Sequence, residues 1–210
     1  AMTTGALTWA TRLAACSFDA MPPVEMSPPL PWAWLRSSGA TLCSSGTRRI
    51  RSWDLTLDHK PSAAELIESV PEPSRYREVV FSGLGEPTLR LNLVLEVAAH
   101  VKTNGGRVRV DTDGLANLVH DRDTLPAMAG LVDSLSVSLN AQDETVYERQ
   151  CRPNLPGSFE AVTDYLRGAR GHVPEVRATA VAGVPGVDIP ACERLAKDLG
   201  VDFRARRMRE

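Results

Sequence analysis

Cysteine is scarce in this sequence, and the few cysteines lie far apart. The 210-residue chain has Cys16, Cys43, Cys151 and Cys192. No two of them have the short spacing of a zinc knuckle or a redox dithiol. A chain of this length can bury a core large enough to fold without disulfide bonds. The spacing therefore argues against a disulfide framework and against a local pair of metal-binding cysteines.

An excess of charge of one sign and long apolar runs are also lacking. The formal net charge is −2, so we expect no basic surface for nucleic acid or for an anionic membrane. No apolar run approaches the roughly 20 residues of a transmembrane helix. The first residues show no charged stretch followed by an apolar one, so we expect no secretory signal. These observations predict one cytoplasmic domain without a membrane or nucleic-acid partner.

Residues 17–49 lack any helical or strand period. They contain five prolines, four of them in two adjacent pairs, which excludes a helix interior and a central strand. A linker or disordered leader is one interpretation, although the two tryptophans and two leucines within 30–35 are more apolar than a linker requires. We therefore divide the chain into an aberrant or poorly ordered segment, 1–52, and a folded core, 53–210.

The core alternates between two kinds of segment. Short apolar runs predict strands at 77–83, 107–110, 134–139, 176–182 and 203–206. Helices are predicted between them, for example where Leu91, Val94, Val97, Ala98 and Val101 repeat at three and four residues. Ser62 with Glu65 predicts a capping box, and the segment from Asp188 to Gly200 predicts another helix. This alternation predicts a parallel sheet with right-handed crossovers, as a partial (βα) barrel or a doubly wound sheet.

Small and polar residues follow four of the predicted strands. They are residues 83–87, residues 111–114, Ser138 with Asn140, and residues 183–186. Each group by itself could be an ordinary turn or a helix cap. The carboxyl ends of parallel strands share one edge of a sheet, however, and ligands bind there. Four such groups together predict a binding site at this edge.

Several of these segments resemble motifs of one enzyme family. Residues 79–89, with Gly83, Gly85, Glu86 and Pro87, resemble the Gly-Gly-Glu-Pro region of radical S-adenosylmethionine (SAM) enzymes, with a bulky residue between the glycines. Residues 111–117 resemble the family's Asn-Thr-Asn-Gly segment, and residues 136–141 and 147–153 complete the pattern. Asp113 replaces the family's usual Asn, and Ser82 stands where a cysteine is common. From about Trp53 onward the chain is most similar to the small radical SAM proteins described as TatD-associated.

The resemblance implies a fold, a cofactor and a set of binding residues. The fold is an α/β, partial (βα)6-type parallel barrel, whose first βα unit is here aberrant or disordered. In such enzymes a [4Fe–4S] cluster holds the methionine end of SAM and cleaves it reductively to a 5′-deoxyadenosyl radical. By this analogy Gly83, Gly85 and Glu86 contact the methionine amino group, Ser138 or Asn140 the ribose, and Gly183 with Val184 the adenine. The full set of expected cofactor-binding residues is Gly83, Gly85, Glu86, Pro87, Thr112, Ser138, Asn140, Gly183 and Val184; no catalytic residue or substrate is implied.

The cluster-binding motif of the family is missing. The family places Cys-x3-Cys-x2-Cys before the helix that begins here at Ser62, and three thiolates hold three of the irons. This chain has only Cys16 and Cys43 there, too far apart for one loop. We therefore expect no cluster and no radical SAM activity from this chain. Either a reading-frame disturbance replaced the residues before Trp53, which an alternative frame encoding the motif would reveal, or the chain is a degenerate homologue.

Two other functions remain open at this stage. One is a non-catalytic domain that still binds SAM or a nucleotide. The other is a divalent-metal-dependent hydrolase, because five oxygen or nitrogen donors lie close together in sequence: Asp111, Asp113, His120, Asp121 and Asp123. Helix-start and turn positions could also explain these acids.

Overall fold

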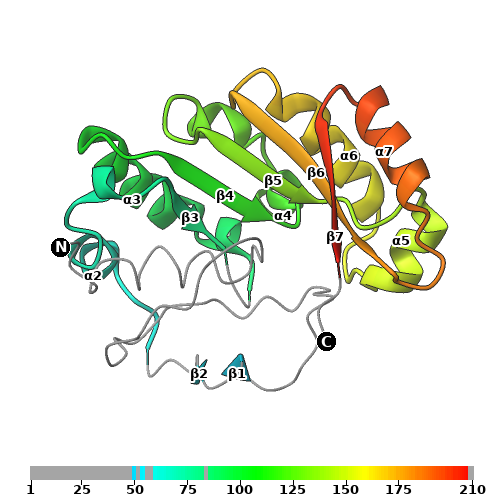
Figure 1. Cartoon of the computed structure of the whole chain (residues 1–210), viewed down its shortest axis with the longest axis horizontal. Helices are drawn as coiled ribbons and strands as arrows, with labels where there is room; N and C mark the ends of the chain where they lie inside the picture. The colour runs from blue at the N-terminus through cyan, green and yellow to red at the C-terminus, as the bar shows by residue number, and fades with distance from the viewer. Residues whose placement is uncertain (1–48, 51–52, 55–58, 83–84, 208–210) are drawn as a thin grey trace. The chain divides into compact units, whose positions relative to one another are not determined.

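The structure is a computed structural model that describes residues 49–50, 53–54, 59–82 and 85–207 (Figure 1). The segment expected to be aberrant, 1–52, lies outside these residues apart from 49–50, and so does Gly83. The described residues form two compact units that divide between Arg109 and Val110. Unit 1 ends at Arg109, and unit 2 comprises residues 110–207.

Five strands form one sheet in the order in which they occur in the chain. They are β3 (Val79–Phe81), β4 (Val108–Thr112), β5 (Ser134–Ser138), β6 (Glu175–Ala182) and β7 (Asp202–Arg207). The pairs β5–β6 and β6–β7 are parallel, with Val137 opposite Ala178 and Thr179 opposite Arg204. The prediction of a parallel α/β sheet is confirmed. Within the described residues the sheet is open, with β3 and β7 as its edges.

Unit 1 is built on a capped helix and a longer amphipathic one. Its elements are β1 (Arg49–Ile50) and β2 (Trp53–Asp54), which pair antiparallel, α2 (Ala63–Glu68), η2 (Pro73–Arg75), β3, η3 (Pro87–Arg90) and α3 (Leu91–Thr103). The predicted capping box is confirmed, because Ser62 Oγ accepts from the Glu65 amide and the Ser62 amide donates to Glu65 Oε2. The apolar face predicted for α3 is buried along its whole length.

Unit 2 places its helices against the apolar face of its strands. Its helices are α4 (Ala116–His120), η4 (Leu125–Met128), α5 (Glu144–Cys151), α6 (Ser158–Ala169) and α7 (Ile189–Asp198). Helix α6 packs on β5 and β6, and α7 packs on β6 and β7 (Figure 1). In β5, Leu135 and Val137 are completely buried, whereas Ser136 and Ser138 are half-buried. The predicted division of β5 into an apolar and a polar face is confirmed.

The ends of α7 are also as predicted. Asp188 Oδ1 accepts from the Ala191 amide at 3.1 Å, which satisfies one of the unpaired amides of the first turn. After the helix, Gly200 has a φ of +74°, a conformation that glycine adopts without steric cost. Within the described segments, no helix has the length and apolarity needed to cross a membrane.

Candidate functional site

In unit 1, the expected cofactor-binding turn after β3 is organised around Glu86. Glu86 is buried and precedes η3, and its Oε1 accepts from the Thr88 amide at 2.9 Å and from the Thr88 hydroxyl at 2.6 Å. Pro87 is the first residue of η3, a position where its fixed φ suits a helix and its missing N–H costs nothing. Gly85 is half-buried. Glu86 therefore caps η3, whatever else it binds.

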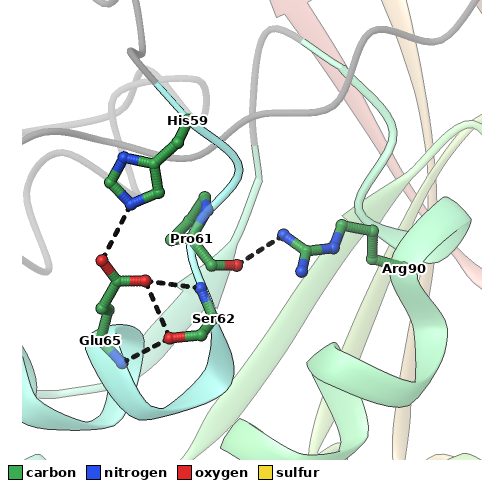
Figure 2. Close-up of polar contacts among 5 residues, drawn as sticks. All are labelled: His59, Pro61, Ser62, Glu65 and Arg90. Atoms are coloured by element: carbon green, nitrogen blue, oxygen red, sulfur yellow. Dashed lines mark hydrogen bonds and ion pairs between the residues drawn. The ribbon is translucent and has the colours of Figure 1, made fainter.

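The segment before α2 is tied to this turn by one side chain. Arg90 Nη1, in the last residue of η3, donates to the Pro61 carbonyl at 2.7 Å (Figure 2). Glu65 receives hydrogen bonds from the Ser62 amide and hydroxyl at 2.8 Å each and contacts His59 Nε2 at 2.9 Å. The segment that leads into α2 is therefore fixed at both Pro61 and Ser62.

In unit 2, the residues after β4 form a tight turn. Thr112 is buried, and its Oγ1 accepts from the Gly114 amide at 3.1 Å, while Asp113 Oδ1 accepts from the Leu115 amide at 3.0 Å. Gly114 has a φ of +82°, and a Cβ there would lie 2.6 Å from Val137 Cγ1. Asp113 is thus a turn residue, one of the two roles left open by the sequence. The turn brings the Thr112 backbone to the carboxyl edge of the sheet.

Asn140 follows β5 in a strained conformation with an unpaired polar atom. Its φ is +59°, which is uncommon for a residue with a side chain. Its amide donates to the Thr179 carbonyl at 3.0 Å, and its Nδ2 donates to Cys151 Sγ at 3.9 Å. Its Oδ1 is buried, and none of the described residues supplies it with a hydrogen bond. Such an oxygen costs about 1–3 kcal/mol, so its position next to a strand end points to a ligand.

Ser138 and Asn140 were considered possible caps of the next helix, and this interpretation is wrong. Helix α5 begins after Asp143, whose Oδ1 accepts from the Val146 amide at 2.9 Å. An aspartate satisfies this amide well, so Ser138 and Asn140 are left for another role. Both lie at the carboxyl edge, as the binding-site prediction requires.

The loop after β6 is held by two glutamines that the sequence did not single out. Gln142 donates through Nε2 to the Gly186 carbonyl at 3.1 Å and accepts at Oε1 from the Asp188 amide at 3.1 Å. Gln150 Nε2 donates to the Pro185 carbonyl at 2.6 Å. The loops after β5 and β6 are therefore joined. The residues that the two glutamines bond lie 35 to 46 positions away along the chain. No local sequence pattern indicates a contact at that separation.

Gly183 and Val184 begin this loop. Gly183 has a φ of +88°, and a Cβ at this position would meet no atom within 4 Å. Val184 is buried, and its carbonyl accepts from the Val187 amide at 3.1 Å. In unit 2 the structure thus brings Thr112, Ser138, Asn140, Gly183 and Val184 to the ends of three adjacent strands. Gly85, Glu86 and Pro87 form the separate turn of unit 1.

The described cysteines do not fit an iron–sulfur cluster. Cys151 and Cys192 are buried in α5 and α7. Burial, the largest cause, raises the pKa of each thiol to about 11. Cluster ligands must be thiolates, and these two thiols are protonated at neutral pH. Cys16 and Cys43 lie outside the described residues.

Of the four acids considered for a metal-dependent hydrolase, Asp111 lies in β4 and the other three lie in turns or at a helix end. Asp123 Oδ1 accepts from the Leu125 amide at 3.1 Å and from Asn117 Nδ2 at 3.3 Å. Asp121 ends α4 with a φ of +49°. Across the segments that the structure describes, no three His, Cys, Asp or Glu residues form a group that could hold a metal ion. The geometry therefore gives this alternative no support.

Comparison with known proteins finds similarity to solved structures. No protein family and no curated protein matches the sequence. Among solved structures, the chain is similar to the N-terminal domain of a putative aldolase from Bacteroides vulgatus, with 12% sequence identity and a TM-score of 0.47. The similarity covers 71% of this chain and 46% of the other.

Proposed function

We propose that this chain is a radical SAM-type protein without a cluster, which binds the nucleoside part of SAM at the carboxyl edge of β4, β5 and β6 and does not cleave it reductively. The proposal is supported by the motif resemblance and by the arrangement of unit 2. The substrate class of any reaction is not part of it. The partial barrel implied by the resemblance belongs to the same proposal.

The observation that carries the proposal is the environment of Asn140. Its buried Oδ1 lacks a donor, and a ribose hydroxyl would supply one. Ser138, two residues earlier in the chain, offers a hydroxyl that can donate or accept. Gly183 has no side chain to obstruct a planar ring, and buried Val184 offers an apolar contact. A nucleoside has hydroxyls at one end and a flat, largely apolar ring at the other, so it matches these groups.

The loss of reductive cleavage follows from the cysteines. In the family the cluster both holds the methionine end of SAM and supplies the electron that cleaves it. The described thiols are buried and protonated, and the three-cysteine motif is absent from the sequence. Assignment of Gly83, Gly85 and Glu86 to the methionine amino group remains a prediction from the resemblance.

Binding of SAM and S-adenosylhomocysteine by calorimetry tests the proposal. With the cluster anchor missing, we expect both ligands to bind with a similar Kd, about 0.1–1 mM, or about 4–5.5 kcal/mol. The substitution Asn140→Gly keeps the positive φ accessible and removes the amide, so we expect it to weaken both ligands about tenfold. Asp121→Gly is a matched control, because Asp121 also has a positive φ and is exposed.

Two results would contradict the proposal. One is the absence of binding at several millimolar SAM by a chain that still unfolds in one cooperative thermal transition. The other is equal affinity in the wild-type chain and Asn140→Gly. Binding of SAM that is much tighter than binding of S-adenosylhomocysteine would instead show that the methionine end is held by groups other than a cluster.

A further inference from the structure

The face of β5, β6 and β7 opposite the helices is polar. Ser138 pairs with Thr179, and Thr179 pairs with Arg204, so these three residues lie in one row across the strands. Paired residues point to the same side of a sheet. Val137, next to Ser138, points to the other side, toward Val162 of α6, because the Cβ position of Gly114 lies near both valines. The row of Ser138, Thr179 and Arg204 therefore faces away from α6.

The side chain of Arg206 extends across this polar face. It lies on β7, yet its Nη2 donates to Ser138 Oγ of β5 at 3.5 Å. These strands are separated by β6, a span of about 10 Å at the usual strand spacing. The guanidinium therefore crosses β6 toward the end of β5, and its Nε is buried. Arginines at an edge normally keep the head group in water, so this inward orientation brings a positive charge to the binding edge.

Arg204 adds a second guanidinium to the same face. It precedes Arg206 by two residues, so the two side chains leave the strand on the same side, about 7 Å apart. Both are half-buried. The acid on this face of β7 is Asp202, which is exposed and lies at the other end of the strand. The positive charge is thus concentrated toward the carboxyl end of β7, beside Ser138.

We propose that Arg204, Arg206 and Ser138 bind the phosphate group of a phosphate monoester. Two guanidinium groups balance the charge of a phosphate dianion, and their planar forks match its oxygens. Ser138 Oγ, which accepts from Arg206 Nη2 at 3.5 Å, also carries a hydroxyl hydrogen that can be donated to a phosphate oxygen. Both arginines make further contacts, which a phosphate would join or replace. SAM has no phosphate, so this ligand is a second molecule. Ser138 then binds the phosphate and the ribose contact falls to Asn140, so the inference does not rest on SAM binding.

Calorimetric titration of the full chain with inorganic phosphate and with glycerol 3-phosphate, at constant ionic strength, tests the inference. We expect saturable binding of both, and none of glycerol. Arg206→Gln should weaken binding at least about tenfold. Arg207→Gln is the matched control, because Arg207 is the next residue, carries the same charge, is exposed and points to the opposite side of β7. It should change the Kd by less than about twofold.

If Arg206→Gln and Arg207→Gln raised the Kd of phosphate equally, phosphate binding would depend only on the net charge of the chain. This result would overturn the inference. The same holds if the folded wild-type chain shows no saturable binding. If Arg206→Gln does not unfold cooperatively, Arg206→Lys replaces it, since lysine keeps the charge and loses the fork. We then expect a several-fold weaker Kd, and an unchanged Kd would contradict the proposal. Because no titration contains SAM, a failure here leaves the SAM proposal standing.

Discussion

At the scale of single residues, Gly114 lies where a side chain would clash with the core. Its φ is +82°, and a Cβ would lie 2.6 Å from Val137 and 3.5 Å from Val162. We predict that Gly114→Ala lowers the free energy of unfolding by about 2–4 kcal/mol, of which about 1 kcal/mol reflects the left-handed backbone and the rest the clash. Urea denaturation of the full chain measures this difference.

Gly130 provides the control for this prediction. Its φ is +74°, and a Cβ there would meet no atom within 4 Å. Gly130→Ala should therefore lower the free energy of unfolding only by the cost of the left-handed backbone, about 1 kcal/mol. If both alanine variants were destabilised equally, the packing of the Gly114 turn against β5 and α6 would be wrong.

The sequence predicted which residues lie at the strand ends, but it did not predict which atoms their side chains contact. The groups around Thr112, Ser138 and Gly183 could be found because strand ends follow from apolar runs. The unpaired oxygen of Asn140 could not, since it depends on which atoms surround the side chain in three dimensions. The position of Arg206 over Ser138, 68 residues away, depends on a strand register that one sequence does not reveal.

At the scale of elements, helix α2 depends on a charged cap. The pKa of Glu65 is lowered to about 2, first by the hydrogen bond from the Ser62 amide, then by the Ser62 hydroxyl and by His59. This value lies below the ordinary glutamate value of about 4.3. The charged carboxylate therefore stabilises the folded state above about pH 4.3, and this contribution is lost as the pH falls through about 2.

We predict that Glu65→Gln lowers the melting temperature near neutral pH and that its difference from the wild type shrinks progressively below about pH 4. Thermal unfolding at a series of pH values measures this. Glu68→Gln, which removes an exposed carboxylate of the same helix, is the control and should show no such convergence. A Glu65→Gln difference that is constant from about pH 6 to about pH 2.5 would be evidence against the charged cap.

The elements found from sequence were those with strong periodicity or explicit caps. Strands β4 to β7 and helices α3, α6 and α7 have regular apolar faces, and their existence was predicted. A helix was also expected after β5, but the bounds of α5 were not predicted, because only three of its eight residues are buried, Val146, Tyr147 and Cys151. The five-residue α4 is too short for a period to be recognised. Both helices pack on α6, and α5 is also capped by the Asp143 side chain; a single sequence does not show this packing.

At the scale of the whole molecule, the number and the burial of the cysteines predict how much iron the chain binds. Of the four cysteines in the sequence, two are buried in helices and protonated, which leaves fewer than the three thiolates that a SAM-binding cluster requires. We predict that the full chain, purified and reconstituted without oxygen, contains little iron and sulfide. Colorimetric iron and sulfide analysis and the visible absorption spectrum measure this. About four irons and four sulfides per chain would contradict the prediction.

The position of β7 at the edge of the sheet has a consequence for association between copies of the chain. An edge strand presents unpaired amides and carbonyls that another strand can use. The strand β7 also contains Arg204 and Arg207, so two copies joined edge to edge would bring these arginines within a Debye length of about 8 Å at physiological salt. Their repulsion opposes a continuous sheet between molecules. Arg204, which is proposed to recognise phosphate, and Arg207, which is not, thus also protect the β7 edge of the described sheet from self-pairing.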